Sequence, residues 1–278
     1  MSWQPGETLW IGAGGKRLEG RCWGPAPDTA PTVVLLHEGL GSAGLWKEFP
    51  EKLADRTGYG VFAYSRAGYG ASDPADLPRP LDYMTREAVD VLPHVLDAIG
   101  VRRGVLLGHS DGASIAAIHA GTVEDFRIRG LCLMSPHFFT EPSGLAAIAE
   151  AKVQYETGDL RERLARHHGD ADNAFRGWND AWLDPRFKAW NIEEAIAYIR
   201  IPVLAIQGDR DPYGTLAQID ALRNGLYSPL DAKIFIGGKH APHLERPAET
   251  VDAVADFLAT LDRIEAAAGL AARGERVA

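Results

Sequence analysis

The sequence predicts an α/β fold: a mostly parallel central sheet with helices on both faces and an inserted helical cap. Short apolar segments alternate with helical segments along most of the chain. The apolar segments are continuous, which is typical of parallel strands buried on both faces. One stretch, residues 136–200, contains no strand-like segment and interrupts the alternation. We therefore expect a core made of residues 1–135 and 201–278, with a helical cap at 136–200.

The first element is a hairpin over residues 7–24, in which the glycines of GAGG supply the positive φ of a tight turn. The parallel strands expected after it cover residues 32–37, 60–65, 104–110, 128–135, 201–209 and 232–238. The expected helices cover residues 44–57, 85–99, 112–120, 215–225 and 247–263. Residues 263–278 favour helix without a firm apolar stripe, which leaves open whether they fray or pair with a second copy in a homodimer.

The expected cap is rich in aromatic side chains. They are Phe138, Phe139, Phe175, Trp178, Trp182, Phe187 and Trp190. Two interpretations stay open: these rings pack the cap onto the core, or they line a pocket for a small-molecule substrate.

Composition excludes several classes of partner. The chain has 278 residues, 46% of them hydrophobic, enough for one compact domain with a large core. It carries 29 basic against 38 acidic residues, a net charge of −9, so nucleic acid and anionic membrane surfaces are not expected partners.

The start lacks a signal-peptide pattern and no apolar run approaches about 20 residues, so we expect a cytoplasmic protein. Cys22 and Cys132 are expected as reduced core thiols.

Polar side chains follow four of the expected strands. They are His37 and Glu38, then His109, Ser110 and Asp111, then Asp209 and Asp211, and finally His240. Ligands bind at the carboxyl ends of parallel strands, so these side chains are expected to converge on one site.

Ser110 is the expected nucleophile. Gly108-His109-Ser110-Asp111-Gly112 follows a strand and opens a helix, the context in which Gly-x-Ser-x-Gly holds a strained, exposed serine. The N–H groups of the following helix favour developing negative charge. A serine also needs a base and an orienting acid, and the stretches AIQGDRDPYG and IFIGGKHAPHLERP supply two aspartates and two histidines.

The motifs LLHEGLGS, YSRAGYGASDP, GHSDG, GDRDPYG and GKHAPHLERP occur in this order over roughly residues 7–262. In this the chain resembles the α/β-hydrolase superfamily, in its capped serine esterase and C–C-bond-hydrolase-like branch. The resemblance implies Asp211 as the acid, because it closes Gly-x-x-Asp, with Asp209 as the rival. It implies His240 as the base, with His243 bracing the loop, and Lys239 standing where glycine is common.

The resemblance also implies two backbone donors for an oxyanion. One is the N–H of Asp111, whose side chain is either a helix-start acid or a substrate contact. The other comes from a loop that usually reads His-Gly-x-Gly, whereas this chain has Glu38 after His37. The departure leaves Gly39 and Leu40 as alternative donors.

Glu38 stands near a site where negative charge must form. Three interpretations remain open: it pairs with a cation such as Arg66 and holds the loop, it contacts a polar substrate group, or it orients water. Of the other histidines, His94 and the pair His167-His168 are expected on exposed helix surfaces.

These residues favour a serine hydrolase that cleaves a small carboxylic ester through an acyl-enzyme. Thioester, lactone or C–C bond cleavage on the same triad is the alternative, and a non-catalytic small-ligand-binding protein is the alternative of another class. No cofactor and no metal site is indicated. An acidic substrate would need inward-facing arginines, for which Arg66, Arg176 and Arg186 are the candidates.

Overall fold

The structure, a computed structural model, describes residues 3–272 and is built on one sheet of eight strands. The strands are β1 (Thr8–Ala13), β2 (Lys16–Trp23), β3 (Thr32–Leu36), β4 (Gly60–Tyr64), β5 (Gly104–His109), β6 (Ile128–Met134), β7 (Val203–Gly208) and β8 (Leu230–Phe235). Their order is β1-β2-β4-β3-β5-β6-β7-β8. The pairs β1–β2 and β2–β4 are antiparallel and every other pair is parallel, which confirms the predicted fold class.

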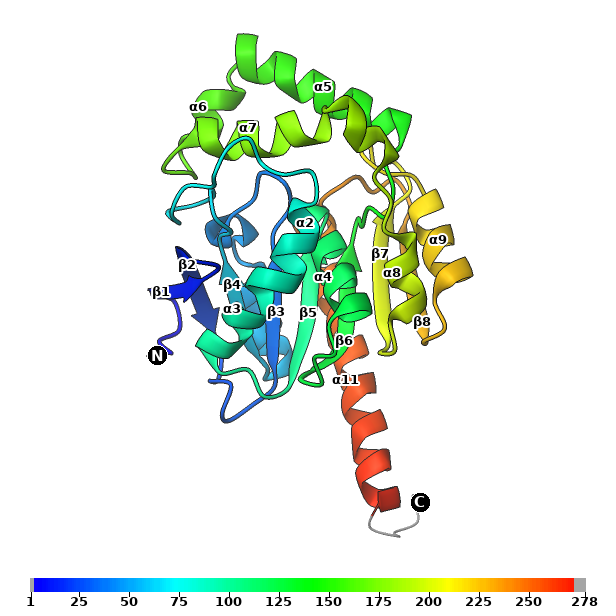
Figure 1. Ribbon diagram of the computed structural model, residues 1–278. Coiled ribbons are helices and arrows are strands. Elements are labelled where there is room, and N and C mark those ends of the chain that lie inside the picture. The colour runs from blue at the N-terminus through cyan, green and yellow to red at the C-terminus, as the bar shows by residue number, and fades with distance from the viewer. Residues whose placement is uncertain (1–2, 273–278) are drawn as a thin grey trace.

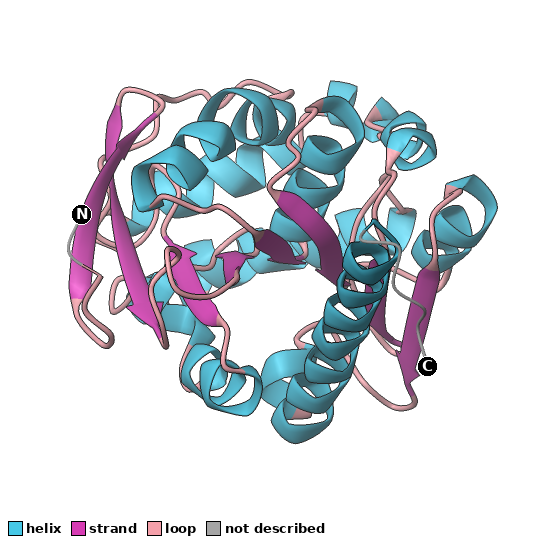
Figure 2. Ribbon diagram, turned by 90° about the horizontal axis from the view of Figure 1, so that it is seen from below, coloured by secondary structure: helices cyan, strands magenta, loops and turns pink. Residues whose placement is uncertain are grey.

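Helices cover both faces of the sheet (Figures 1 and 2). One face carries α1 (Phe49–Thr57) and α11 (Pro247–Ala272). The other carries α2 (Tyr83–Arg86), α3 (Leu92–Ile99), α4 (Asp111–Thr122), α8 (Glu193–Tyr198) and α9 (Ala217–Gly225). The sheet therefore separates two apolar layers, each closed by helices.

Strand β3 contributes side chains to both apolar layers. All five of its residues are buried. Val34 and Leu36 join the layer under α4, whereas Val33 and Leu35 join the layer under α1 and α11. Successive side chains of a strand point to opposite faces, so a strand buried on both sides must be apolar throughout.

Three further helices and a short 3-10 helix lie over the carboxyl edge of the sheet (Figure 1). They are α5 (Pro142–Thr157), α6 (Leu160–Leu164), α7 (Ala171–Trp182) and η3 (Pro185–Ala189). Helix α8, which follows them in the chain, packs beside α4 and α9 instead.

The helices differ in detail from the sequence prediction. The helix expected at 44–57 is a 3-10 helix, η1 (Ala43–Trp46), followed by α1. The helix expected at 85–99 contains a π-helical stretch, η2 (Glu87–Val91), which ends two residues before Pro93. Proline has no N–H and crowds the preceding turn, so the regular hydrogen-bond ladder is broken there. Helix α11 continues to Ala272, beyond the predicted end, while residues 273–278 lie outside the described range.

Two further findings concern membrane-spanning helices and the two cysteines. Across residues 3–272, none of the helices combines the length and the apolar character needed to cross a membrane. Cys22 and Cys132 are buried free thiols, in β2 and β6.

Leu107 on β5 is fully buried, whereas Phe126 before β6 is 87% exposed, and this contrast predicts opposite effects on stability. We expect Leu107→Ala to lower the free energy of unfolding by about 3 kcal/mol, because it leaves a cavity in the apolar layer. Phe126→Ala is the matched control and should change it by less than about 0.5 kcal/mol. Urea unfolding followed by circular dichroism measures both. Equal effects would contradict the layer assignment.

Candidate active site

Ser110 occupies a sharp turn between β5 and α4. Its backbone has φ 54° and ψ −118°, a conformation that side-chain-bearing residues rarely adopt. A Cβ atom on Gly112 would lie 1.9 Å from the carbonyl oxygen of Leu36, and one on Gly108 would lie 2.2 Å from that of Gly112. Both glycines are therefore required by close backbone contact, and they force the serine into the turn.

Asp211 and His240 lie side by side at the same edge of the sheet. His240 Nδ1 is 2.7 Å from Asp211 Oδ2. The Asp211 carboxylate also accepts hydrogen bonds from the Tyr213 N–H (2.8 Å) and from Gln207 Nε2 (3.0 Å). Because a carboxylate accepts here, the proton lies on His240 Nδ1 and leaves Nε2 available as a base.

The rival acid, Asp209, has a different contact. Its side chain accepts a hydrogen bond from the Gly237 N–H at 2.6 Å and holds the turn after β8. Burial raises the pKa of Asp211, but the hydrogen bonds from His240 and Tyr213 lower it by more, so the net pKa is below its ordinary value.

Aromatic and imidazole rings enclose His240. The ring centroids of Tyr213 and His137 lie 4.7 Å and 5.8 Å from that of His240. His243 packs instead against Trp46 at 4.8 Å and His109 at 5.0 Å, as a brace behind the loop. Burial lowers the pKa of both His137 and His243 to about 3, so both rings are neutral near pH 7.

The loop after β3 is held by Arg66, though not in the way that the sequence suggested. The fully buried Arg66 guanidinium donates to the carbonyl oxygens of His37 and Glu38, the latter at 3.0 Å. The expected pairing of Arg66 with the Glu38 carboxylate is wrong. A backbone carbonyl at a strand end needs a partner once it is buried, and Arg66 supplies two such donors.

The Glu38 carboxylate faces His109, the residue directly before the nucleophile. Glu38 Oε2 lies 3.6 Å from His109 Nδ1, and His109 Nε2 lies 2.7 Å from the carbonyl oxygen of His240. Burial raises the pKa of Glu38, and His109 and neighbouring histidines lower it by more, so its net pKa lies well below the ordinary range. The carboxylate is therefore ionised at neutral pH.

The two alternative oxyanion donors lie under the helices at the carboxyl edge. A Cβ on Gly39 would be 2.2 Å from Trp178 Nε1 of α7, so this indole lies directly on the loop. The carbonyl of Leu40 accepts from His168 Nε2 at 3.0 Å, and His168 Nδ1 accepts from the Gly70 N–H at 3.0 Å. The expectation that His168 is exposed on a helix is wrong, since it is buried between two loops.

Asp111 also has a partner that the sequence did not reveal. Its carboxylate accepts a hydrogen bond from the Tyr83 hydroxyl, which in turn accepts from Trp182 Nε1 of α7 at 3.0 Å. Burial raises the pKa of Asp111, and Arg66 and Tyr83 only partly oppose this. The side chain is therefore buried and connected through Tyr83 to Trp182 of α7.

Several charged candidates lie away from the site. Arg176 and Arg186 are exposed, and Arg186 pairs with Asp184 at 2.7 Å. Lys239 is exposed as well.

Of the further residues at the site, His109 could be found most easily from the sequence, because it adjoins Ser110. Tyr83 and His168 gave no local signal, since their partners are distant in the chain.

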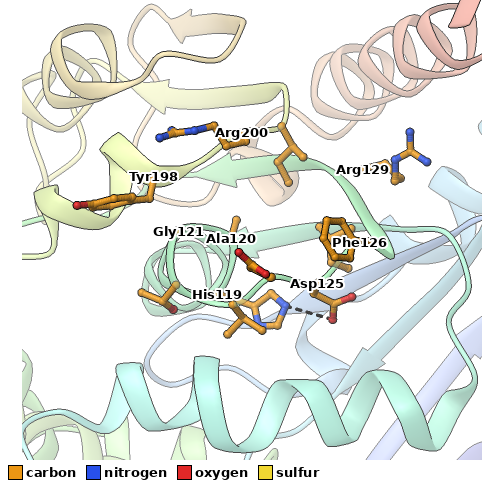
Figure 3. Close-up of a pocket in the computed structure, with 13 residues that line it drawn as sticks. His119, Ala120, Gly121, Asp125, Phe126, Arg129, Tyr198 and Arg200 are labelled. Carbon is orange, nitrogen blue, oxygen red and sulfur yellow. Dashed lines mark ion pairs between the residues drawn. The ribbon is translucent and has the colours of Figure 1, made fainter.

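A surface hollow of about 720 Å³ lies at the opposite edge of the sheet (Figure 3). It is lined by the last turn of α4 and the start of β6, and His119 Nε2 there lies 3.5 Å from Asp125 Oδ2. This hollow contains none of the candidate active-site residues. Over residues 3–272, no group of three or more histidine, cysteine, aspartate or glutamate side chains is arranged to hold a metal ion.

Comparison with known proteins gives one family and several relatives. Residues 33–253 match the model described as "Alpha/beta hydrolase family". The chain is 25% identical to the proline iminopeptidase of Lactobacillus delbrueckii subsp. bulgaricus, over 87% of this chain and 94% of that protein. It is also 25% identical to epoxide hydrolase A of Mycobacterium tuberculosis, over 84% and 92%. The solved enol-lactonase of Burkholderia xenovorans LB400 has the same fold, with a TM-score of 0.71, 22% identity and coverage of 90% and 100%.

The neutral buried histidines predict loss of stability in acid. With an unfolded pKa of about 6.5, a histidine takes up its proton in the unfolded state first, so the free energy of unfolding falls as pH falls from 6.5 toward 3. The folded-state pKa values of His137 and His243, both about 3, give an expected loss of about 2 kcal/mol from each between pH 7 and 5. We expect His243→Gln to lose about 2 kcal/mol less than the wild type over this range. Equal losses in urea titrations at the two pH values would refute this.

Proposed function

Because the chain belongs to the alpha/beta hydrolase family, we propose that it is a serine hydrolase that cleaves a small carboxylic ester. The proposed triad is Ser110, His240 and Asp211. The observation that carries the proposal is the 2.7 Å contact between His240 Nδ1 and Asp211 Oδ2, at the edge where Ser110 occupies its strained turn.

In the proposed reaction His240 Nε2 takes the proton of Ser110 as the serine oxygen attacks the acyl carbon. Asp211 stabilises the imidazolium that forms. The oxyanion is bound by the N–H of Asp111, at the start of α4, and by that of Gly39 or Leu40. The protonated His240 then gives its proton to the departing alcohol. Water, activated by the same histidine, releases the acid and restores the serine.

The charge of the site favours an uncharged acyl group. Of the three candidate arginines, Arg66 is committed to two backbone carbonyls, and Arg176 and Arg186 are exposed. The rings of Tyr213, His137 and Trp182 supply apolar or neutral contact area instead, with Trp182 and His137 centroids 5.4 Å apart.

A lactone is the second candidate, supported by the fold shared with the solved enol-lactonase. Lactone opening uses the same attack and the same oxyanion donors, and the alcohol stays tethered to the acyl group. Epoxide opening is not proposed, although one relative is named an epoxide hydrolase, because that chemistry in this family uses an aspartate at the position of Ser110.

We further propose that residues 136–200 form the insert that supplies a cap over this site. Trp178 lies against Gly39 and Trp182 is hydrogen-bonded to Tyr83, so α7 contacts both the proposed oxyanion loop and the nucleophile side. Through such contacts the proposed cap admits only small substrates and keeps water away from the oxyanion.

The test is covalent labelling with a fluorophosphonate, read by intact mass and peptide mapping, together with hydrolysis of p-nitrophenyl esters of increasing acyl length. We expect one adduct, on Ser110, absent from Ser110→Ala. Asp211→Asn should lower kcat by about 10³–10⁴-fold, because the histidine loses its orienting acid.

Asp209→Asn is the matched control, since it makes the same chemical change at the rival aspartate. It should retain activity within about threefold, because the amide oxygen can still accept from the Gly237 N–H. A folded protein without an adduct, or equal losses in the two asparagine variants, would refute the proposed triad.

A further inference from the structure

Glu38 and His109 are not used by any step of the proposed reaction, yet they lie in contact beside it. Glu38 Oε2 is 3.6 Å from His109 Nδ1, which is an ion-pair distance and longer than a hydrogen bond. The His109 side chain is 3% exposed and that of Glu38 is 31% exposed. Among residues 3–272, His109 Nδ1 has no hydrogen-bond partner. A buried polar atom of this kind needs an explanation.

The other ring nitrogen fixes the protonation pattern. His109 Nε2 lies 2.7 Å from the carbonyl oxygen of His240. A carbonyl oxygen only accepts, so Nε2 carries a proton. With Nδ1 unprotonated, its lone pair would face the Glu38 carboxylate, which is repulsive. With Nδ1 protonated, an imidazolium faces a carboxylate on one side and donates a charge-assisted hydrogen bond on the other.

The contacts join three separate loops. Glu38 belongs to the loop after β3, His109 ends β5, and His240 lies in the loop after β8. The Glu38 carboxylate also lies against Gly41, since a Cβ on Gly41 would be only 2.2 Å from Glu38 Oε2. The proposed oxyanion loop, nucleophile turn and base loop are therefore connected through one carboxylate and one imidazole.

Other titratable groups surround this pair. His37 adjoins Glu38 and accepts from the Arg66 N–H at 3.1 Å, and His243 packs on His109 at 5.0 Å. The charge of Lys47, after η1, lowers the pKa of His243, and the charge of Glu38 raises that of His168. The ring centroid of His240 lies 5.0 Å from that of His109. The pKa of His37, of His168 and of His243 is lowered chiefly by burial, so these rings are neutral and do not replace His109 as the cation beside Glu38.

We propose that Glu38 and His109 form a positioning pair, in which Glu38 keeps a proton on His109 Nδ1 so that His109 holds the backbone of His240 against the nucleophile turn. The inference rests on the proposed function, because it assigns the pair to the placement of the catalytic base. It gives a reason for the carboxylate where the family usually has glycine.

Glu38→Gln tests the charge with little change in shape. An amide cannot stabilise the Nδ1 proton as a carboxylate does, and the hydrogen bond to His240 then becomes a weaker neutral one. We expect kcat for a p-nitrophenyl ester to fall about tenfold at pH 8 with KM within about twofold. Glu38→Asp keeps the negative charge on a shorter side chain and should retain more of the wild-type kcat than Glu38→Gln. A role in packing alone would give the opposite order, because glutamine matches the shape of glutamate.

His109→Gln provides the second variant, because a glutamine amide can still donate to the His240 carbonyl without needing a negative neighbour. Glu38→Gln should cause less than a twofold further loss in the His109→Gln background. Asp209→Asn is the matched control for removing a carboxylate at this edge and should retain kcat within about threefold. Circular dichroism and thermal unfolding verify that each variant is folded.

The possible outcomes distinguish a failure of the proposed Glu38–His109 pair from a failure of the proposed triad. If fluorophosphonate labels Ser110 in the wild type and Glu38→Gln labels and turns over at the wild-type rate at every pH, the positioning pair is refuted and the serine hydrolase stands. The pair would also be refuted if the double variant lost activity by the product of the factors measured for Glu38→Gln and His109→Gln alone, because the two residues would then act independently. If the wild type gives no Ser110 adduct, the proposed function itself fails.

Discussion

The first turn of α4 approaches the end of β3 so closely that no side chain fits between them, and the site depends on this contact. A Cβ on Gly112 would collide with the backbone of Leu36. The packing of helix on sheet therefore imposes the positive φ of Ser110, which the chain would otherwise avoid. It also presents the Asp111 N–H beside the loop that follows β3, so the proposed nucleophile and the proposed oxyanion donors are fixed by one contact.

Once this edge is buried, its charges must be compensated locally. The structure does so with two carboxylate–imidazole contacts, Asp211 with His240 and Glu38 with His109. The neighbouring His243 stays neutral because burial disfavours its charged form. An edge that contains many histidines thus carries few cations, so in the proposed reaction the oxyanion is stabilised by backbone N–H groups.

The helices over the carboxyl edge pack against the two segments that meet at this contact. Trp182 reaches Asp111 through Tyr83, and Trp178 lies on Gly39. A shift of α7 would therefore disturb both the nucleophile turn and the loop after β3. If these helices form the proposed cap, the same side chains link substrate entry to the geometry of the site, because packed interiors transmit displacements with little compression.

The sequence by itself determined the order of the elements and the side chains that converge. Continuous apolar strands such as Thr32–Leu36 can only be buried on both faces, and parallel strands bring their carboxyl ends to one edge. The tertiary structure decided which side chains touch there. Glu38 faces His109 rather than Arg66, because Arg66 satisfies buried carbonyl groups, and His168 is buried by a loop about one hundred residues away in the chain, at Gly70. Partners of this kind depend on how loops from different strands meet in space, and spacing along the chain does not encode that.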